Sequence, residues 1–472
     1  EALYNTSGDE SDGFLSVLVN SIDIYGNQNE YGGTTDGTKV RFDKVLPALN
    51  QISVSSSNIW NQSWAKVGDT IQYNVNASED LLNISLLVQG NNTTITELSL
   101  IEYSFQYIFT NDNSDGQVNF EVIFSDSAGN SGDIVTETTN SSYTIFDKIP
   151  PSDFTVQDVI TVGENSIANA WNSTNSAINI IIPVSDDESL DSGRVQIIAK
   201  VANNDFENLD SYHFFQSSDL NNSKIVSVSE SLVESISGFS ENDTITISAI
   251  IYDVPGNMTI GSESNTKLVI NQSIPIIINS NIESDFSDSS LAGVDNIITL
   301  VFETDTEIII PSVTISGQEA IIVNLGDNEW QASYTMQSSD EDGIIPFVID
   351  FMDVYGNPNS VINSTEDGTS VTFDNSKPSL SFVSIKSSNQ DTTFAKVGDT
   401  ITIIFEADEV LTSQIASINS NNTEITSINE GLLTKYYAKY VMENTDNEGE
   451  INFEIIVTDS IGIQSNPVTE TT

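Results

Sequence analysis

The sequence contains no cysteine and only one histidine, His213, among its 472 residues. Without cysteine the chain has neither a disulfide framework nor a thiolate metal site, and one histidine cannot supply a two-histidine metal centre. A Ser-His-Asp triad would have to use His213, which stands beside aromatic residues in the sequence SYHFFQ. No pair of carboxylates is marked out by an apolar setting, so we expect that the protein is not an enzyme.

Positive charge is scarce as well. The 14 Lys and Arg residues face 69 Asp and Glu residues, which gives a formal net charge of -55. Such a field repels phosphate backbones and anionic lipids, and this argues against nucleic-acid binding and electrostatic docking on a membrane. No apolar run is long enough for direct membrane insertion. Cations are therefore the expected partners, because salt or bound divalent ions relieve the repulsion within the chain.

The sequence repeats itself. The heptapeptide AKVGDTI occurs at 65–71 and again at 395–401, and VTETT occurs at 135–139 and again at 468–472. Two more divergent copies of the same frame lie between them, which indicates tandem domains. The predicted units are 1–46, the last strands of an incomplete domain; 47–148; 149–273, a divergent domain with an insertion; 274–376; and 377–472, a domain that lacks its closing strand.

The local pattern predicts strands. Segments such as TIQYNV, INFEIIV and TITISAIIY are rich in β-branched and aromatic residues, largely alternate in polarity and are separated by turn residues. No stretch carries a sustained 3.6-residue apolar period, so helix should be scarce. Units of about a hundred residues with roughly seven short strands each predict an all-β chain of tandem immunoglobulin-like β-sandwich domains in an extended array.

The frame AKVGDTITIIFEADE, INFEIIVTDSIG and DGTSVTFD resembles the bacterial and archaeal immunoglobulin-like (Big-type) tandem repeats of giant surface proteins. This resemblance implies an extracellular structural protein at the cell surface, part of a surface layer, a filament or an adhesin stalk. The alternative is an adhesin module in which the divergent unit 149–273 recognises a glycan or a protein partner. The insertion that carries His213, Phe214 and Phe215 would then form the binding site.

Acidic residues recur at equivalent positions of the repeats. They follow the second strand, open the D-x-x-G turn after the sixth strand, and stand in the linker that enters a unit. In an immunoglobulin-like sandwich these three places lie at the same pole, so we expect the acids to converge at each junction. The candidate ligands are Asp43, Glu79, Asp126, Asp147, Asp187, Asp253, Asp305, Asp353, Asp374, Glu409 and Asp459.

Calcium is the candidate cofactor of such junctions, because it is a hard cation that takes six to eight oxygen ligands. The cadherin-like and adhesin-like arrays that these repeats resemble also imply calcium in the linkers. A second interpretation stays open, since an Asp that opens a D-x-x-G turn bonds to its own backbone and the other acids can be solvated surface.

Asn-x-Ser/Thr sequons are candidate glycosylation sites. Their number is close to the chance expectation for this composition, so they mark candidates only. The candidates are Asn61, Asn83, Asn92, Asn172, Asn221, Asn242, Asn363 and Asn421. Trp60 and Trp64 are the best candidates for stacking on a glycan, because they stand in a predicted loop between strands.

The ends of the sequence carry incomplete repeats. An unpaired strand edge invites a strand from a neighbouring molecule, so self-association through the repeats or through strand exchange is one hypothesis. The sixth strand is present at both ends, however, and a simple exchange would leave one strand over. We therefore favour the interpretation that the sequence is part of a longer repeat protein.

Overall fold

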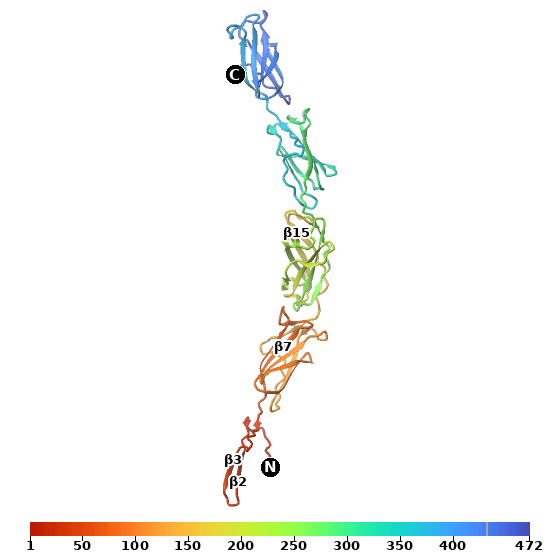
Figure 1. Ribbon diagram of the computed structural model, residues 1–472, viewed down its shortest axis with the longest axis vertical. Helices are drawn as coiled ribbons and strands as arrows, with labels where there is room; N and C mark the ends of the chain where they lie inside the picture. Colours follow the sequence, from red (N-terminus) through yellow and green to blue (C-terminus); the bar gives the residue numbers. More distant parts are fainter. Residues whose placement is uncertain (431–432) are drawn as a thin grey trace. The chain divides into compact units, whose positions relative to one another are not determined.

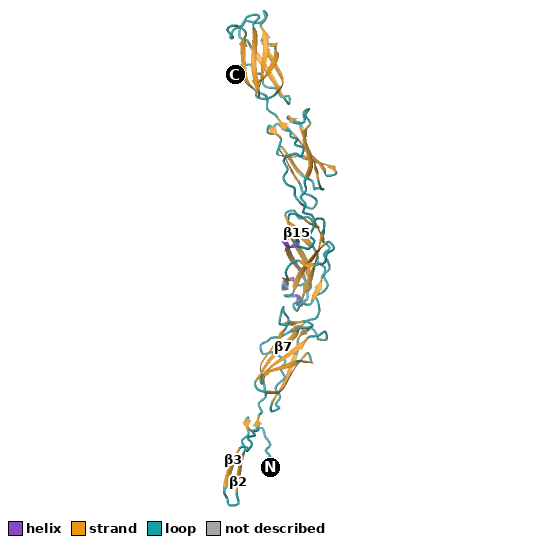
Figure 2. Cartoon of the chain, in the orientation of Figure 1, coloured by secondary structure: helices purple, strands orange, loops and turns teal. Residues whose placement is uncertain are grey.

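The computed structural model describes residues 1–430 and 433–472, and nearly all of its elements are β-strands (Figures 1 and 2). Helix in the described residues is limited to α1 (Glu230–Val233) and two short 3-10 turns, η1 (Glu188–Leu190) and η2 (Ser217–Asp219). Four separate hydrophobic cores follow one another along the chain. The predicted all-β fold of tandem immunoglobulin-like β-sandwiches is confirmed.

Contacts divide the chain into two compact units, each described by itself below. Unit 1 comprises Glu1–Trp171 and Asn175–Ile270, and unit 2 comprises Asn172–Thr174 and Asn271–Thr472. This division is coarser than the five domains expected from the repeats, whose bounds stay a prediction. No helix in the described part of the chain is long and apolar enough to span a bilayer.

The first sandwich lies in unit 1. Its strands are β5 (Leu49–Ser56), β6 (Trp64–Ala65), β7 (Thr70–Ala77), β8 (Leu81–Val88), β9 (Asn91–Asn92), β10 (Thr94–Ser99), β11 (Glu102–Ile108), β12 (Gly116–Gln117), β13 (Phe120–Asp126) and β14 (Ile145–Phe146). They form the antiparallel sheets β10-β11-β7-β5 and β13-β8-β9 and the small sheet β12-β14-β6, in which β14 runs parallel to β6.

Alternation of polarity fixes which face of each strand is buried. In β7 the side chains of Ile71, Tyr73 and Val75 enter the core, while the residues between them face outward. The short closing strand β14 matters more than its length indicates, because Phe146 is fully buried and stacks on Phe109 with the ring centroids 4.4 Å apart. Burial of one such ring contributes about 1.5–3 kcal/mol.

The second sandwich, also in unit 1, is the divergent one. Its strands are β15 (Val159–Gly163), β16 (Ala170–Trp171), β17 (Asn175–Val184), β18 (Arg194–Val201), β19 (Glu207–Asn208), β20 (His213–Phe214), β21 (Asn222–Ser229), β22 (Thr244–Tyr252), β23 (Met258–Ile260) and β24 (Leu268–Ile270). A three-stranded sheet, β15-β17-β21, faces a seven-stranded sheet built around β16-β24-β22-β18-β19.

The insertion of the second sandwich is packed into its own sheet. Strand β20 pairs with β18, Phe215 is buried, and the His213 ring lies 2.9 Å from a carboxylate oxygen of Asp210. Of the three residues predicted to form a binding loop, only Phe214 has a largely exposed side chain.

The third sandwich, in unit 2, repeats the arrangement of the first. Its strands are β25 (Ile277–Ser284), β26 (Leu291–Ala292), β27 (Ile297–Thr304), β28 (Ser312–Ile315), β29 (Gln318–Glu319), β30 (Ile321–Gly326), β31 (Glu329–Thr335), β32 (Gly343–Ile344), β33 (Phe347–Asp350) and β34 (Thr372–Phe373). The sheets are β25-β27-β31-β30, β29-β28-β33 and β26-β34-β32, and the closing strand β34 buries Phe373 as β14 buries Phe146.

The fourth sandwich, in unit 2, has a four-stranded and a three-stranded sheet that correspond to the two larger sheets of the first and third sandwiches. Its strands are β35 (Leu380–Ser387), β36 (Thr400–Ala407), β37 (Leu411–Ile418), β38 (Asn421–Asn422), β39 (Glu424–Glu430), β40 (Leu433–Val441) and β41 (Phe453–Asp459), in the orders β35-β36-β40-β39 and β38-β37-β41. Residues 394–395, which match β6, form no ladder with the described residues, and Phe394 is 70% exposed.

The N-terminal segment of unit 1 consists of two strand pairs. Strand β1 (Gly13–Phe14) pairs with β4 (Arg41–Phe42), and β2 (Leu18–Ile22) pairs with β3 (Gln28–Gly32). Strands β2 and β3 are labelled in Figure 1. The pairing of β1 with β4 repeats that of β32 with β34 in the third sandwich.

Candidate metal centre

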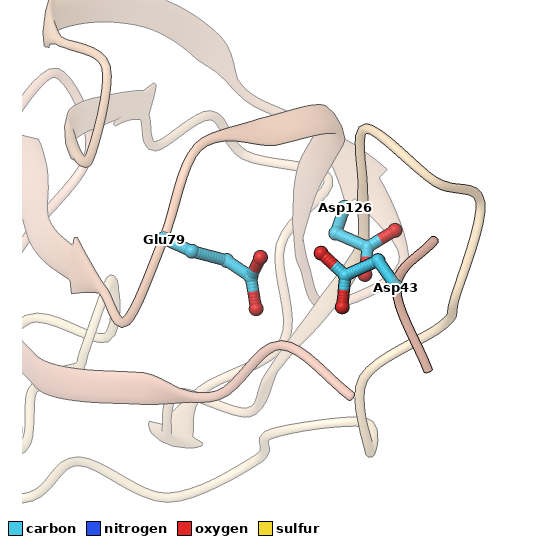
Figure 3. A group of neighbouring side chains, drawn as sticks. All are labelled: Asp43, Glu79 and Asp126. Carbon is cyan, nitrogen blue, oxygen red and sulfur yellow. The ribbon is translucent and has the colours of Figure 1, made fainter. Parts of the chain in front are cut away.

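Three carboxylates converge where the N-terminal segment enters the first sandwich, and Figure 3 shows them pointing toward one another. Asp43 follows β4 in the linker, Glu79 follows β7, and Asp126 ends β13. One carboxylate oxygen of each residue lies within 4.8 Å of those of the other two. Two oxygens on one calcium ion, each at about 2.3–2.6 Å, can be no more than about 5 Å apart, so this first acidic cluster fits a shared ion.

Asp126 is held in place by the turn that it opens. Its Oδ1 atom accepts the backbone amides of Ala128 and Asn130 at 2.9 Å each, and its Oδ2 atom accepts the side-chain amide of Asn130 at 2.8 Å. Burial raises the pKa of Asp126, but the hydrogen bonds from Asn130 and the turn outweigh it and hold the pKa below its usual range. The carboxylate is therefore fixed, ionised and aimed by its own backbone.

A positively charged side chain of the protein, that of Arg41, lies beside the first acidic cluster. Arg41 places its Nη2 atom 3.2 Å from the Oδ2 atom of Asp43. Burial and the charges of Asp43 and Asp126 raise the pKa of Glu79, and the charge of Arg41 lowers it. Arg41 thus offsets part of the repulsion that three converging carboxylates create.

The last acidic cluster has the same construction at the entrance to the fourth sandwich. Asp374 follows β34, Glu409 follows β36, and Asp459 ends β41. Their carboxylate oxygens also lie within 4.8 Å of one another. The same three positions of the repeat therefore meet twice, once in each unit.

Asp459 differs from Asp126 in one contact. Its Oδ1 atom accepts the amides of Ile461 and Ile463 at 3.0 and 2.8 Å, but its buried Oδ2 atom has no hydrogen-bond partner among the described residues. The reason is that Ile463 stands where Asn130 stands in the first turn. A buried carboxylate oxygen without a partner is costly, and a bound cation would satisfy it.

Of the two loop glutamates, Glu409 in the last acidic cluster has the more strongly raised pKa. Burial, followed by the charges of Asp374 and Asp459, raises the pKa of Glu409 to about 7. Three negative groups without a neighbouring arginine are the donor set that a hard divalent cation prefers.

At the joint before the second sandwich the predicted acids are engaged by the protein itself. Asp187 accepts the amide and the hydroxyl of Ser189 at 2.9 and 2.8 Å and caps η1. Asp253 accepts the amide of Asn257 at 2.6 Å, and burial raises its pKa to about 7. Burial also raises the pKa of Asp147. These three do not form a carboxylate group of the kind found at the two clusters.

At the joint before the third sandwich the linker carries an amide. Asn271 takes the place of Asp43 and accepts two hydrogen bonds from the side chain of Asn357, at 2.8 and 3.0 Å. Asp353 is satisfied within its turn by Asn357.

Asp305 is displaced by one position in the repeat. It follows Thr304 at the end of β27, whereas Glu79 stands two residues after the end of β7, so the residue that matches Glu79 is Thr306. The Asp305 carboxylate instead accepts the amide of Ile276 at 2.9 Å. The prediction of a cluster at this joint fails because neither the linker nor the loop supplies its acid.

One predicted glycosylation site is wrong. Asn172 is fully buried, and its side-chain nitrogen, to which a glycan would be attached, donates to the carbonyl oxygen of Tyr355 at 2.7 Å. Asn61 is half-buried, and the other six candidates are exposed. Of the two tryptophans, Trp64 is half-buried, while Trp60 is 42% exposed and contacts Arg194.

Three residues that decide the electrostatics of the clusters were missed at the sequence level: Arg41, Asn130 and Ile463. A comparison of the turns DSAGN and DSIGI would have revealed the exchange of Asn130 for Ile463. Arg41 could not be found in this way, because arginine recurs at no matching position of the other linkers.

The architecture and the paired clusters define a class, the tandem immunoglobulin-like β-sandwich chains with acidic joints. No protein-family model and no curated protein matches the sequence. The fold is similar to that of a solved calcium-stabilised adhesin with which an Antarctic bacterium binds ice, with 14% identity over 89% of this chain and 98% of that one and a TM-score of 0.37.

Two further solved structures are similar in the same sense. A 1.5-MDa bacterial ice-binding adhesin is 16% identical over 69% of this chain and 98% of that one, with a TM-score of 0.31. The D1–D4 ectodomain fragment of ICAM-5 is 9% identical over 89% of this chain and 98% of that one, with a TM-score of 0.28. At these identities the likeness concerns the fold alone.

Proposed function

We propose that the protein is an extracellular structural protein of the cell surface, and that its tandem sandwiches build a surface layer, a filament or an adhesin stalk with joints stiffened by calcium. The observation that carries this proposal is the recurrence of one carboxylate triad, from the same three repeat positions, at two joints. Structural turn residues alone need no such convergence, because an Asp that opens a D-x-x-G turn is held there by amides of its own turn.

Each triad joins three separate segments of the fold. The linker Asp follows the last strand of the preceding segment, β4 or β34, whereas the Glu and the turn Asp belong to the following sandwich. Calcium, when bound, supplies the positive charge that lets the three carboxylates approach. In the first acidic cluster the Asn130 side chain adds a hydrogen bond to the backbone oxygen of Asp43 at 3.2 Å, so the linker is oriented before any ion binds. Such a joint transmits force along the chain with a fixed geometry.

The composition of the chain supports the proposed extracellular setting. A net charge of -55 keeps the chain soluble in salt water and concentrates cations around it. The exposed sequons are the positions at which we propose glycans: Asn83, Asn92, Asn221, Asn242, Asn363 and Asn421. Self-association through the repeats or through strand exchange is the proposed route of assembly.

A glycan-binding or protein-binding role of the second sandwich has weaker support. Phe215 is in the core and His213 is bonded to Asp210, so the insertion is largely used to complete its own domain. We therefore retain the structural role as the proposed function.

Thermal unfolding of the full chain, with calcium and with a chelator, tests the proposal. An ion at a hundred times its Kd stabilises by about 2.7 kcal/mol, which for one sandwich raises Tm by roughly 10–20 °C at about 4–8 °C per kcal/mol. Control variants with Glu121→Gln and Glu454→Gln remove exposed acids from β13 and β41 outside the clusters and should keep the full response. An identical melting curve with and without calcium refutes the proposal.

A further inference from the structure

Arg194 is a buried charge without a carboxylate partner. The first residue of β18 is only 3% exposed, and it forms no ion pair with a carboxylate in the described part of the chain. Its Nη1 atom lies 3.5 Å from the carbonyl oxygen of Asp253, and its Nε atom has no hydrogen-bond partner among the described residues. A guanidinium taken out of water in this way must be compensated by something other than a salt bridge.

Aromatic rings supply the compensation. The guanidinium carbon lies 3.6 Å from the ring centroid of Trp60, 4.6 Å from that of Tyr252 and 5.1 Å from that of Tyr212. Trp60 and Tyr212 meet edge to face at 5.5 Å. A cation over aromatic faces is attracted by the ring quadrupole, most strongly over tryptophan and in a desolvated site. Trp60 belongs to the first sandwich and the other three residues to the second, so this aromatic cage crosses the joint inside unit 1.

Polar contacts hold the two sides of the cage together. The Asn58 side chain accepts the amide of Trp60 at 3.0 Å and donates to the carbonyl oxygen of Pro255 at 2.8 Å. Lys66 donates to the carbonyl oxygen of Gly256 at 2.9 Å. Gly256 adopts a φ of 94°, and a Cβ atom there would lie 3.6 Å from the Trp60 ring. The turn of the second sandwich is therefore seated against the loop of the first.

The cage is specific to this joint. The strands that match β18 in the first and fourth sandwiches, β8 and β37, begin with Leu81 and Leu411, and the loop 388–394, which matches the Trp60 loop, contains no tryptophan. At the same joint the carboxylates of Asp147, Asp187 and Asp253 are not among the described groups whose oxygens lie within 4.8 Å of one another. The joint thus has a protein cation where the two clusters have converging carboxylates.

We infer that the joint between the first and second sandwiches is closed by the chain's own cation, Arg194 clamped by Trp60, and stays rigid without calcium. The inference goes beyond the proposed function, because it assigns a metal-independent joint to a chain that carries acidic clusters at the entrances to its first and fourth sandwiches. Such a chain would bend at selected joints when calcium is withdrawn.

Distance measurements between spin labels on the full chain test this inference, and the absence of native cysteine makes the labelling specific. One pair, Thr96→Cys and Ser227→Cys, spans the aromatic joint from exposed strand positions, and a second pair, Glu319→Cys and Ser413→Cys, spans the last acidic cluster. The first pair is also measured with Trp60→Ala, and with Tyr143→Ala as a matched exposed aromatic control. Each sample is measured with calcium and with a chelator.

The expected result for the first pair is one narrow distance distribution with and without calcium, broadened at least twofold by Trp60→Ala and unchanged by Tyr143→Ala. With Trp60→Phe the distance distribution should be narrower than with Trp60→Ala, because phenylalanine keeps an aromatic face toward Arg194. A distribution that is broad in both conditions, one that narrows only with calcium, or one that Trp60→Ala leaves narrow overturns the inference. The second pair reports separately on the last acidic cluster. A distance distribution there that does not respond to calcium would contradict the proposed calcium joint but not the inference about the aromatic joint.

Discussion

The first and last acidic clusters have the same backbone frame and different neighbours. Both combine a linker Asp, a loop Glu and a turn Asp. In the first, Arg41 and Asn130 satisfy part of the negative charge. In the last, Thr372 and Ile463 stand at those positions, and a buried oxygen of Asp459 has no partner among the described residues. The fold therefore brings the acids together in both clusters, whereas single neighbouring side chains determine how much negative charge is left for a cation to neutralise.

The largest effect is expected from Asp459→Asn. The amide oxygen can still accept the turn amides, and the amide nitrogen replaces the unpartnered oxygen, so the variant should fold with unchanged or higher stability in chelator. Its fourth sandwich should lose the stabilisation by calcium, about 3 kcal/mol at saturating ion. Calorimetric scans with and without calcium check this, with Glu454→Gln as the control. A full calcium response in Asp459→Asn would show that the last cluster is not the site.

The exchange Ile463→Asn should make the last cluster resemble the first. A new side-chain amide would donate to the free oxygen of Asp459, which removes an unsatisfied buried acceptor worth about 1–3 kcal/mol. We expect the variant to be more stable in chelator and to bind calcium more weakly. The reciprocal Asn130→Ile should weaken the first sandwich in chelator. Equal urea midpoints of Ile463→Asn and the parent chain without calcium would contradict this explanation.

The pKa of Glu409, about 7, predicts a pH dependence of the last cluster. Between its ordinary value of 4.5 and pH 7 the folded chain holds a proton that the unfolded chain has lost, so stability without calcium falls as pH rises through this window. Calcium needs the ionised carboxylate, so its stabilising effect should be larger at pH 8 than at pH 6. Melting of the parent chain and of Glu409→Gln at both pH values measures the difference. A calcium response independent of pH would argue against Glu409 as a ligand.

The smallest effect concerns Arg41. Its side chain is 61% exposed, so its pair with Asp43 is worth only about 0.2–1 kcal/mol. Arg41→Thr, which copies the last linker, should tighten calcium binding at the first cluster by up to about fivefold. A calcium titration that shows weaker binding would mean that Arg41 organises the site instead of competing with the ion.

The sequence predicts the fold through periodicity, because alternation in segments such as 70–77 and the recurrence of AKVGDTI determine strands and repeats without tertiary information. It predicts convergence at Asp43 and Asp374, since the topology places the linker and both loops at one pole. It could not predict the joints before the second and third sandwiches. Before the second sandwich, Asp187 caps the 3-10 turn η1. Before the third, a shift of one residue puts Thr306 at the position that Glu79 has in the first sandwich.

The aromatic cage shows another limit of sequence reasoning. Arg194 lies in the apolar strand RVQIIAKV, where it reads as an exposed residue at a strand end. Its main contact, Trp60, comes from the preceding sandwich. Only tertiary structure brings these residues together, because no local pattern encodes a contact across a joint.

The calcium stoichiometry of the full chain, measured by equilibrium dialysis together with isothermal titration calorimetry, tests directly whether the two acidic clusters are the calcium sites. We expect two ions for each chain, one of which is lost in Asp459→Asn. No bound calcium, or four equivalent ions that also occupy the joints before the second and third sandwiches, would contradict this expectation.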